Sequence, residues 1–359
     1  MESTSSSVLR VLDANVDRCR EGLRVLEDVA RFVLDDAFLS ASLRDLRHRV
    51  TQAASYLGPG LMNARRAQED VGASLNAPQQ PLVDLTELLT ANSKRVQEGL
   101  RVLEEFARLP DLARQLDGSW FKSARFTVYD HEQRLVGRVL RLDKVQKLKG
   151  VYFILDPTTT QGRPEIQVAE EALAGGASVL QLRDKMREKG IQLNVALALR
   201  ELCHRHEALF IVNNDPDLAL AVDADGVHLG QRDFPLRVAR QILPLDRIIG
   251  ISAATYDEAH QADVDGADYI AVGSIYPTQS KEDTRPAGLE TLRRVRGLTK
   301  RPLVAIGGID VANIEAVLDA GADSVAVISA IASADDPKLA TEQLVESFRR
   351  RRGADSGSA

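Results

Sequence analysis

Amide and cationic side chains gather directly after a short apolar run near residue 180. Gln181, Arg183 and Lys185 are spaced by two, so that on an extended strand all three would leave on one face. Guanidinium and ammonium groups form charge-assisted hydrogen bonds with phosphate oxygens, so this row indicates a site for an anionic ligand. An ion-pair layer inside a barrel is the alternative, and the absence of an alternating acid within the row favours the ligand.

Amides and carboxylates follow the next two apolar runs. Asn213, Asn214 and Asp215 follow the first, and Asp233 ends the G-Q-R-D segment after the second. Mg2+ is commonly held by one or two carboxylates and amide oxygens, completed by substrate phosphates, so these residues are candidates for a magnesium site. Helix capping is the alternative, because a proline that can begin a helix follows soon after each aspartate.

Hydroxyl groups and glycines follow the later runs. The segment 277–281 reads P-T-Q-S-K; its hydroxyls and lysine can bind phosphate oxygens, although in isolation such a segment is more often an ordinary turn. Gly307 and Gly308, and the I-S pair at 328–329, follow the last two runs, where barrels often bind phosphate. Ser252 ends an earlier run, and His228, inside another, is interpreted as a satisfied buried histidine.

Short apolar runs alternate with amphipathic segments from residue 150 onward, which is typical of a parallel sheet with helices on its faces. Eight runs are predicted to be strands, at 151–156, 179–183, 209–213, 226–231, 248–252, 269–273, 303–307 and 324–329. Helices are expected between them, for example at 165–175, 191–206, 257–265 and 311–320. Eight such units fit an α/β fold of the closed (β/α)8 TIM barrel type, with its active site on the loops after the strands. A doubly wound open sheet is the alternative, but its Gly-rich first turn is absent.

The first part of the chain contains an internal repeat. Residues 14–31 match residues 91–108 at 12 of 18 positions. The apolar residues of each copy recur in steps of three and four, which predicts one buried stripe on a long helix. Further apolar stretches near 38–57 and 119–142 also fit helices. Residues 8–142 are therefore expected to form two related helical hairpins in a bundle, connected by the Gly/Pro/Asn-containing segment 58–81.

Both copies of the repeat also share a second stripe of Asn, Arg and Gly. Its members are Asn15, Arg18 and Gly22, and then Asn92, Arg95 and Gly99. Glycine inside a helix costs about 1 kcal/mol relative to alanine, so its recurrence indicates close helix crossing. The polar members are predicted to pair with Glu21 and Glu98 between the two helices, in preference to forming a second ligand site.

Length and composition limit the domain count and the functional class. The 359 residues are expected to comprise an all-helical bundle over 1–143, a linker at 144–149, a barrel over 150–351 and a disordered tail at 352–359. A net charge of −6 argues against nucleic-acid binding. The N-terminus lacks a leader pattern and no apolar run approaches the roughly 18 residues of a membrane span, so a cytoplasmic protein without a membrane partner is expected. Cys19 and Cys203 are far apart and support neither a disulfide framework nor a thiolate zinc site.

Seven segments of the second half form an ordered series. They are Y-F-I-L-D at 152, Q-L-R-D-K at 181, V-N-N-D-P-D-L-A at 212, A-D-G-V-H-L-G-Q-R-D at 224, G-I-S at 250, A-D-Y-I-A-V-G-S-I-Y-P-T-Q-S-K at 267 and A-I-G-G-I at 305. Taken together and in this order, they resemble the thiamine phosphate synthase family over nearly all of residues 150–335. The helical repeat resembles an N-terminal extension carried by some bacterial members.

The resemblance implies a transferase that joins hydroxymethylpyrimidine diphosphate to hydroxyethylthiazole phosphate and releases pyrophosphate and thiamine phosphate. Mg2+ is the implied cofactor, held by Asn214 and Asp233. The residues implied to hold the pyrimidine diphosphate are Gln181, Arg183, Lys185, Asn213 and Lys281. Those implied to hold the thiazole phosphate are Thr278, Ser280, Gly308, Ile328 and Ser329. The implied catalytic residues are Lys281, Arg183 and Ser252.

The family mechanism is dissociative and requires no general base, which agrees with the absence of a His/Asp or Cys/His pair from the motifs. Two positions depart from the family pattern. Asn214 replaces an aspartate that binds magnesium, which implies weaker Mg2+ binding unless Asp215 substitutes, and Ala254 replaces a histidine on which the related thiazole tautomerase relies. That tautomerase and a non-catalytic barrel that binds thiazole or thiamine phosphates are the alternatives. Small phosphorylated molecules are the expected partners, and the sequence leaves both a monomer and a homo-oligomer open.

Overall fold

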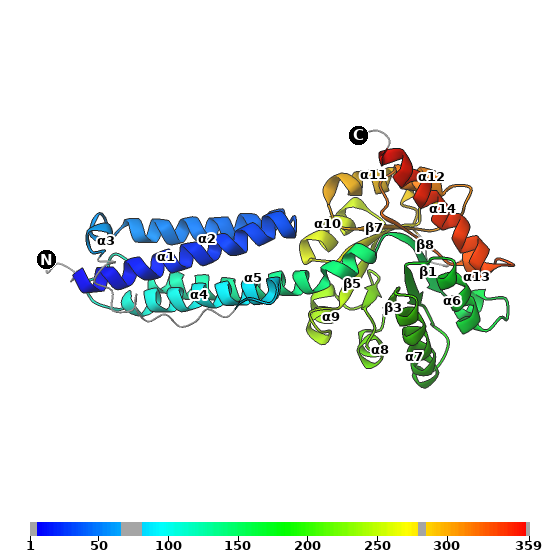
Figure 1. Cartoon of the computed structure of the whole chain (residues 1–359), viewed down its shortest axis with the longest axis horizontal. Coiled ribbons are helices and arrows are strands. Elements are labelled where there is room, and N and C mark those ends of the chain that lie inside the picture. Colours follow the sequence, from blue (N-terminus) through cyan, green and yellow to red (C-terminus); the bar gives the residue numbers. More distant parts are fainter. Residues whose placement is uncertain (1–5, 66–80, 279–284, 357–359) are drawn as a thin grey trace. The chain divides into compact units, whose positions relative to one another are not determined.

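The computed structural model describes residues 6–65, 81–278 and 285–356, apart from the side chains of residue 54 and residues 352–356. The chain divides into two compact units, Met1–Leu140 and Arg141–Ala359. The elements described in the first unit are helices, and the second unit contains a closed barrel (Figure 1). The predicted fold class, a TIM barrel preceded by a helical bundle, is confirmed.

The described residues of the first unit lie mainly in α-helices, the last of which continues past Leu140, and a five-residue π-helix (Val29–Val33) follows the first. The α-helices are α1 (Ser6–Asp28), α2 (Ala37–Ser55), α3 (Gly60–Asn63), α4 (Leu85–Phe106) and α5 (Gly118–Lys147). α1 packs against both α2 and α4. Its predicted apolar stripe is buried at Leu12, Val16, Cys19, Leu23 and Leu26. The order of the long helices agrees with the predicted pair of hairpins.

The two copies of the repeat cross closely at their glycines. A Cβ atom on Gly22 would lie 2.6 Å from Val96 Cγ2, and one on Gly99 would lie 2.6 Å from Cys19 Sγ. Neither position has room for a side chain, so the close crossing predicted from the recurring glycine is confirmed. Gly22 lies after Cys19 in α1 but meets Val96, which lies before Gly99 in α4. The two helices are therefore antiparallel. The repeat therefore forms a pair related by a pseudo-two-fold axis.

The polar residues of the repeat make bonds within their own helices. Asn15 Nδ2 donates to Val11 O at 2.8 Å, and Asn15 Oδ1 accepts from Arg18 Nη1 at 3.5 Å. The second copy repeats both bonds, at 2.9 and 3.2 Å. The predicted pairing with Glu21 and Glu98 is wrong. Each arginine donates to the asparagine three residues before it in the same helix instead.

Eight parallel strands close into a barrel in sequence order. They are β1 (Gly150–Leu155), β2 (Val179–Leu182), β3 (Leu209–Asn213), β4 (Gly226–Leu229), β5 (Ile248–Ala253), β6 (Tyr269–Gly273), β7 (Leu303–Ile306) and β8 (Ser324–Val327). Each predicted strand is present, with ends no more than two residues from those expected. Side chains alternate along β1, so that Tyr152 and Ile154 belong to the cluster inside the barrel while Val151 and Phe153 pack toward the helices.

Helices cover the outside of the barrel (Figure 1). They are α6 (Glu165–Ala174), α7 (Lys189–Arg205), α8 (Pro216–Ala221), α9 (Leu236–Ile242), α10 (Tyr256–Asp265), α11 (Gly288–Leu298), α12 (Ile314–Asp319), α13 (Ser329–Ala332) and α14 (Pro337–Ser356). α6, α7, α10 and α12 confirm the four helices predicted by residue range. Among the helices described, none combines the length and the apolar character that a membrane span requires.

Two segment boundaries differ from those expected. Residues 144–147 belong to α5 rather than to a linker. Within the second unit, Lys144 Nζ donates to Asp246 O at 2.9 Å and Arg141 Nε donates to Asp268 Oδ1 at 2.7 Å. These bonds attach the end of α5 to the barrel, so this segment is not an unattached linker. At the other end α14 continues to Ser356, so the backbone of residues 352–356 is helical rather than part of a disordered tail.

Candidate active site

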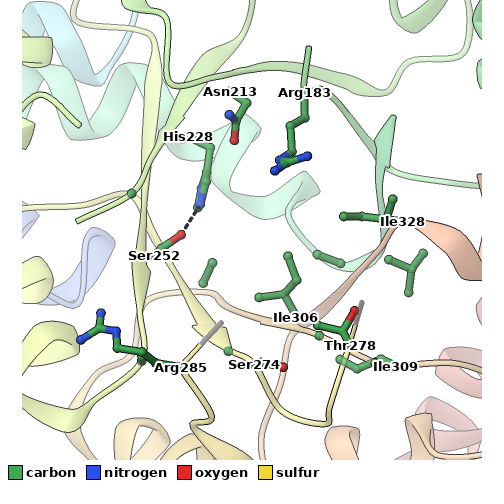
Figure 2. Close-up of a pocket in the computed structure, with 18 of the residues that line it drawn as sticks. Arg183, Asn213, His228, Ser252, Ser274, Thr278, Arg285, Ile306, Ile309 and Ile328 are labelled. Carbon is green, nitrogen blue, oxygen red and sulfur yellow. Dashed lines mark hydrogen bonds between the residues drawn. The ribbon is translucent and has the colours of Figure 1, made fainter. Parts of the chain in front are cut away.

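A cavity of about 1740 Å3 lies at the carboxyl ends of the barrel strands. Each strand contributes residues that end the strand or follow it. In strand order, contributing residues include Thr159, Arg183, Asn213, Asp233, Ser252, Thr278, Gly308 and Ser329. Figure 2 shows side chains from several of these strands around one space. TIM barrels carry their active sites on this rim, so the cavity is the candidate active site.

Most of the site residues predicted from the sequence line this cavity. They are Arg183, Lys185, Asn213, Asn214, Asp233, Ser252, Thr278, Gly308, Ile328 and Ser329. Gln181 is not among the lining residues, because its side chain lies inside the barrel with 2% of its surface exposed. Ser280 and Lys281 lie outside the described residues.

Arg183 is held at the cavity wall by an acid from the neighbouring strand. Its Nη1 donates to Asp156 Oδ2, and both side chains are largely buried. Asp156 follows β1, which pairs with β2 so that Leu155 lies opposite Leu182. The row of cations therefore does have an acidic partner, contrary to the sequence interpretation, because that partner comes across the sheet rather than along the strand.

A chain of five hydrogen-bonded side chains, here called the tyrosine–histidine chain, runs from the barrel interior to the cavity. Gln181 Nε2 donates to Tyr152 OH at 2.7 Å, and Tyr152 OH lies 2.9 Å from Tyr269 OH. His228 Nδ1 lies 3.0 Å from Tyr269 OH, and His228 Nε2 lies 2.9 Å from Ser252 Oγ (Figure 2). His228 is a satisfied buried histidine, as predicted, but it also lines the cavity, which the sequence interpretation missed.

The amide of Gln181 fixes the direction of this chain. Because it donates to Tyr152 OH, the phenol proton of Tyr152 goes to Tyr269 and that of Tyr269 goes to His228 Nδ1. Burial raises the pKa of both tyrosines, so both phenols keep their protons. His228 then carries its proton on Nε2 and donates it to Ser252 Oγ. The hydroxyl proton of Ser252 is thereby left to act as a donor toward the cavity.

Asn214 follows β3 and Asp233 follows the adjacent β4; both line the cavity, and we call this part of its wall the metal corner. Asn214 has a φ of +65°, a left-handed conformation that asparagine tolerates better than most residues. Its N–H donates to the carbonyl of His228 on the adjacent strand at 2.8 Å. Asp233 Oδ2 accepts from Gly230 N–H at 2.6 Å, which ties the carboxylate to the loop after β4.

The chemistry of this corner fits Mg2+. A carboxylate and an amide oxygen are hard ligands of the type that Mg2+ prefers. Asp215 does not line the cavity and pairs with Lys189 at 2.7 Å, so Asn214 is the residue of the two that faces the site. Among the residues described, no group of three or more His, Cys, Asp or Glu side chains is placed to hold a metal by itself. A metal bound here would take further ligands from substrate phosphates and water.

The glycine pair after β7 has a backbone conformation that favours glycine. Gly307 has a φ of +105° and Gly308 one of +62°. A Cβ atom on Gly308 would lie 2.5 Å from Pro277 O, so the loops after β6 and β7 pack directly on each other. After β8, Ser329 begins the short helix α13, and the first N–H groups of a helix lack partners within it. Loops after the last two strands, joined to a short extra helix, are the usual phosphate site of this fold.

An ion pair on the cavity wall was not anticipated from the sequence. Arg285 Nη2 lies 2.7 Å from Glu258 Oε1, and both residues line the cavity. Glu258 is oriented by the start of α10, where Thr255 Oγ1 accepts from Glu258 N and Glu258 Oε2 accepts from Ala254 N. The T-x-x-E spacing at 255–258 is typical of a capping box and could have indicated Glu258 from the sequence. The contact between Arg285 and Glu258 depends on the fold. Ser274 also lines the cavity; it lies within the segment that begins at residue 267, but the sequence interpretation did not single it out as a site residue.

Comparison with known proteins agrees with this geometry. Residues 151–331 match the family model described as thiamine monophosphate synthase. The thiamine-phosphate synthase of Synechocystis sp. is 42% identical, with 97% of this chain and 98% of that protein covered. That of Gloeobacter violaceus is also 42% identical, with 96% and 97% covered. The solved structure of the thiamine phosphate pyrophosphorylase from Pyrococcus furiosus matches at 43% identity with a TM-score of 0.53, covering 57% of this chain and 96% of that one.

The helical unit has a match of its own, because residues 10–134 fit the model of the ThiD2 family. The two relatives described above extend over both units, since each alignment covers nearly the whole of both chains. The P. furiosus structure accounts for a share of this chain close to that of the barrel alone. The barrel motifs, the closed eight-stranded fold and the full-length relatives agree, and the chain belongs to the thiamine monophosphate synthase family.

Proposed function

We propose that the barrel cavity joins 4-amino-2-methyl-5-hydroxymethylpyrimidine diphosphate to hydroxyethylthiazole phosphate, giving thiamine phosphate and pyrophosphate. The observation that carries this proposal is one cavity lined at two places by groups that are suited to anions. One is formed by the cations and amides after β2 and β3, and the other by the hydroxyl and glycine loops after β6 to β8. In a ring of eight strands, β2 and β3 lie across from β6 and β7. Two phosphorylated substrates can therefore enter from the two sides and meet.

The region after β2 and β3 is suited to the diphosphate of the pyrimidine. Arg183 has its guanidinium oriented by Asp156, and Lys185 and Asn213 line the same wall. Oriented cations stabilise charge that develops on a leaving group without reorganising during the reaction. Lys281 is assigned to the same diphosphate by the family motif alone. Gln181 would act on this substrate indirectly, through the tyrosine–histidine chain.

The region after β6 to β8 is suited to the phosphate of the thiazole. Thr278 supplies a hydroxyl, and Gly308 supplies backbone that approaches the loop after β6 closely. Ile328 and Ser329 contribute the start of α13. Ser280 joins this set by the family motif. Backbone N–H groups and hydroxyls together provide several donors to one phosphate.

Asn214 and Asp233 would hold Mg2+. A metal ion held there would supply positive charge that stabilises the diphosphate as a leaving group. One carboxylate and one neutral amide give the ion less charge than two carboxylates would, so we expect the diphosphate itself to contribute much of its binding.

The reaction follows a dissociative course that this set of side chains can support. The bond between the pyrimidine methylene carbon and the diphosphate oxygen breaks, and its electron pair leaves with the pyrophosphate. The aminopyrimidine ring stabilises the resulting cation, and the thiazole nitrogen donates its lone pair to form the new C–N bond. No proton is transferred to a base. Arg183 steadies the leaving group, and the donor hydroxyl of Ser252 orients the pyrimidine or the departing pyrophosphate.

The thiazole tautomerase is not favoured as a second function. Ala254 lines the cavity at the position where that activity relies on a histidine, and an alanine side chain cannot move a proton. The full-length relatives described above carry the synthase name.

Release of pyrophosphate tests the proposal directly. The full-length protein, given both substrates and Mg2+, is expected to release pyrophosphate and form thiamine phosphate, while omission of either substrate should stop both. Lys281→Ala should reduce turnover by about 100-fold or more if the lysine steadies the leaving group. Lys300→Ala, which removes an exposed lysine before β7, is the matched control and should leave turnover unchanged. Binding of both substrates without pyrophosphate release, at any Mg2+ concentration, would refute the synthase function.

A further inference from the structure

A hollow of about 340 Å3 lies between the two copies of the repeat in the helical unit. We call it the α1–α4 hollow, and its main lining residues are Asn15, Arg18, Lys94, Arg95, Glu98 and Gly99. Its volume lies at the lower end of the roughly 300–1,000 Å3 typical of pockets for small molecules. All of these residues belong to the helical unit, so the hollow is independent of the barrel cavity.

Two equivalent arginines face this hollow because of the pseudo-two-fold arrangement. Arg18 and Arg95 occupy the same position in the two copies, 77 residues apart. The antiparallel crossing at Gly22 and Gly99 brings the two helices close enough for both arginines to line one space. When two helices are related by a true or approximate two-fold axis, a contact made by a residue of one helix is also made by the equivalent residue of the other.

Each arginine is held by its own helix rather than by an acid. Arg95 Nη1 donates to Asn92 Oδ1 at 3.2 Å, and Asn92 Nδ2 donates to Leu88 O at 2.9 Å. The equivalent bonds in the first copy hold Arg18 through Asn15. Both asparagines are buried, at 6% and 5% exposure, so their amides are fixed points. The guanidinium groups are therefore positioned, while the asparagine leaves their positive charge uncompensated.

The charge in the hollow is predominantly positive. Arg18, Lys94 and Arg95 line it together with one acid, Glu98, among the residues described. Within the described part of the chain none of these four residues forms an ion pair. Other exposed arginines of the same two helices do so, as in the pairs Arg20–Asp17, Arg24–Asp28 and Arg101–Glu104. Gathering like charges is unfavourable unless an anion lies among them.

Phosphate is suited to these groups, because a phosphate monoester carries more negative charge than a carboxylate and can balance more of the three cations. Guanidinium groups bind phosphate oxygens through two parallel N–H bonds, and an ammonium adds a third cation as a point charge. The volume exceeds what a bare phosphate needs and leaves room for a small organic group. We propose that the helical unit binds a phosphate-bearing small molecule in the α1–α4 hollow, with Arg18 and Arg95 on its phosphate. This site is separate from the barrel reaction and does not depend on the function proposed for the barrel.

Hydrogen–deuterium exchange on the full chain tests this proposal locally. The probes are inorganic pyrophosphate and phenyl phosphate, compared with sodium chloride at equal ionic strength. Each phosphate probe is expected to slow exchange in peptides covering residues 11–25 and 88–102. Arg18→Gln with Arg95→Gln should raise the concentration of half-maximal protection by about 100-fold, since each charged bond is worth about tenfold or more. Slowing of barrel peptides by pyrophosphate should be the same in the variant, which separates this site from the barrel.

Two further variants make the outcome decisive. Arg20→Gln with Arg101→Gln removes the same charge from the same helices outside the hollow and should leave the protection intact. Arg95→Lys keeps the charge but not the planar fork, so an intermediate loss is expected from a folded protein. The proposal is overturned if neither phosphate probe slows exchange at these peptides in the unaltered protein. It is equally overturned if the Arg18/Arg95 variant keeps its protection, or if the Arg20/Arg101 variant loses as much.

Discussion

His228 Nε2 lies 2.9 Å from Ser252 Oγ, and this contact joins the interior of the barrel to its active-site cavity. The other ring nitrogen of the histidine lies 3.0 Å from Tyr269 OH, which helps to hold the ring in this orientation. The rotamer and tautomer of a residue in the site are thus set by a phenol that lies deeper in the barrel. Substitutions in the barrel interior should therefore alter the reaction without touching either substrate.

Tyr269→Phe tests that link. The ring is retained, but His228 Nδ1 and Tyr152 OH each lose a partner, which should destabilise the barrel by about 1–3 kcal/mol. We expect kcat to fall by roughly threefold to tenfold, with the KM for the thiazole phosphate unchanged, because Ser252 serves the pyrimidine side. Tyr256→Phe removes a phenol from the barrel surface and is the control. Steady-state kinetics and thermal unfolding measure both effects; equal kcat values for the two variants would separate the chain from catalysis.

Asn214→Asp should lower the Mg2+ requirement. A second carboxylate in the metal corner adds charge next to the ion, so the Mg2+ concentration for half-maximal rate should fall by roughly threefold to tenfold. The comparison is Asp215→Asn, which removes a carboxylate that pairs with Lys189 and should leave the requirement as it is. Titration of initial rates with Mg2+ measures this. An identical requirement before and after Asn214→Asp would remove this residue from the metal.

Gly308→Ala should impair binding of the thiazole phosphate. The new Cβ would lie 2.5 Å from Pro277 O, at a φ of +62°, so the loops after β6 and β7 must move apart. We expect the KM for the thiazole phosphate to rise by about tenfold or more while the KM for the pyrimidine diphosphate stays constant. Gly297→Ala, where the added methyl would meet open space in α11, is the control. Parallel increases in both KM values would show that the loop does not discriminate between the substrates.

The buried carboxylate of Asp268 predicts acid sensitivity of the barrel. Burial raises its pKa, but Arg141, Arg240 and the N–H of Ile249 lower it further, so the net shift is downward. The folded state then binds the proton more weakly than the unfolded state. This contribution to stability is complete above about pH 4 and is lost as the pH falls from there through the folded pKa.

Asp268→Asn separates this contribution from the rest. At neutral pH it should destabilise the barrel by about 3–5 kcal/mol, because two buried arginine contacts lose their counterion. The difference from the unaltered protein should shrink as the pH falls below about 4. Urea unfolding at several pH values, with the exposed Asp217→Asn as control, measures it. A difference that stays constant down to pH 3 would place the acid sensitivity elsewhere.

The strands and the rim of the site could be predicted from the sequence because each depends on local pattern. Apolar runs of four to six residues define β1 to β8, and the carboxyl ends of parallel strands must share one edge. Residues as distant in sequence as Arg183 and Ser329 were therefore assigned to one cavity without knowledge of their contacts.

Interactions that depend on register or rotation could not be predicted. Asp156 reaches Arg183 because Leu155 lies opposite Leu182, and no pattern within β2 reports this alignment. The expected pairing of the repeat with Glu21 and Glu98 failed for a related reason. Spacing shows which residues share a helix face. It does not show whether an arginine on that face donates to a buried asparagine amide or to a glutamate carboxylate.

The two helices that cross at Gly22 and Gly99 can differ in sequence at equivalent positions, which the two subunits of a homodimer cannot. Two identical chains about a true symmetry axis must present every residue twice. Here both copies lie in one chain, so equivalent positions have diverged: Asp17 corresponds to Lys94, and Cys19 to Val96. Because the two copies of the repeat belong to one chain, their equivalent residues can differ. An asymmetric ligand can therefore be bound between them in a single orientation.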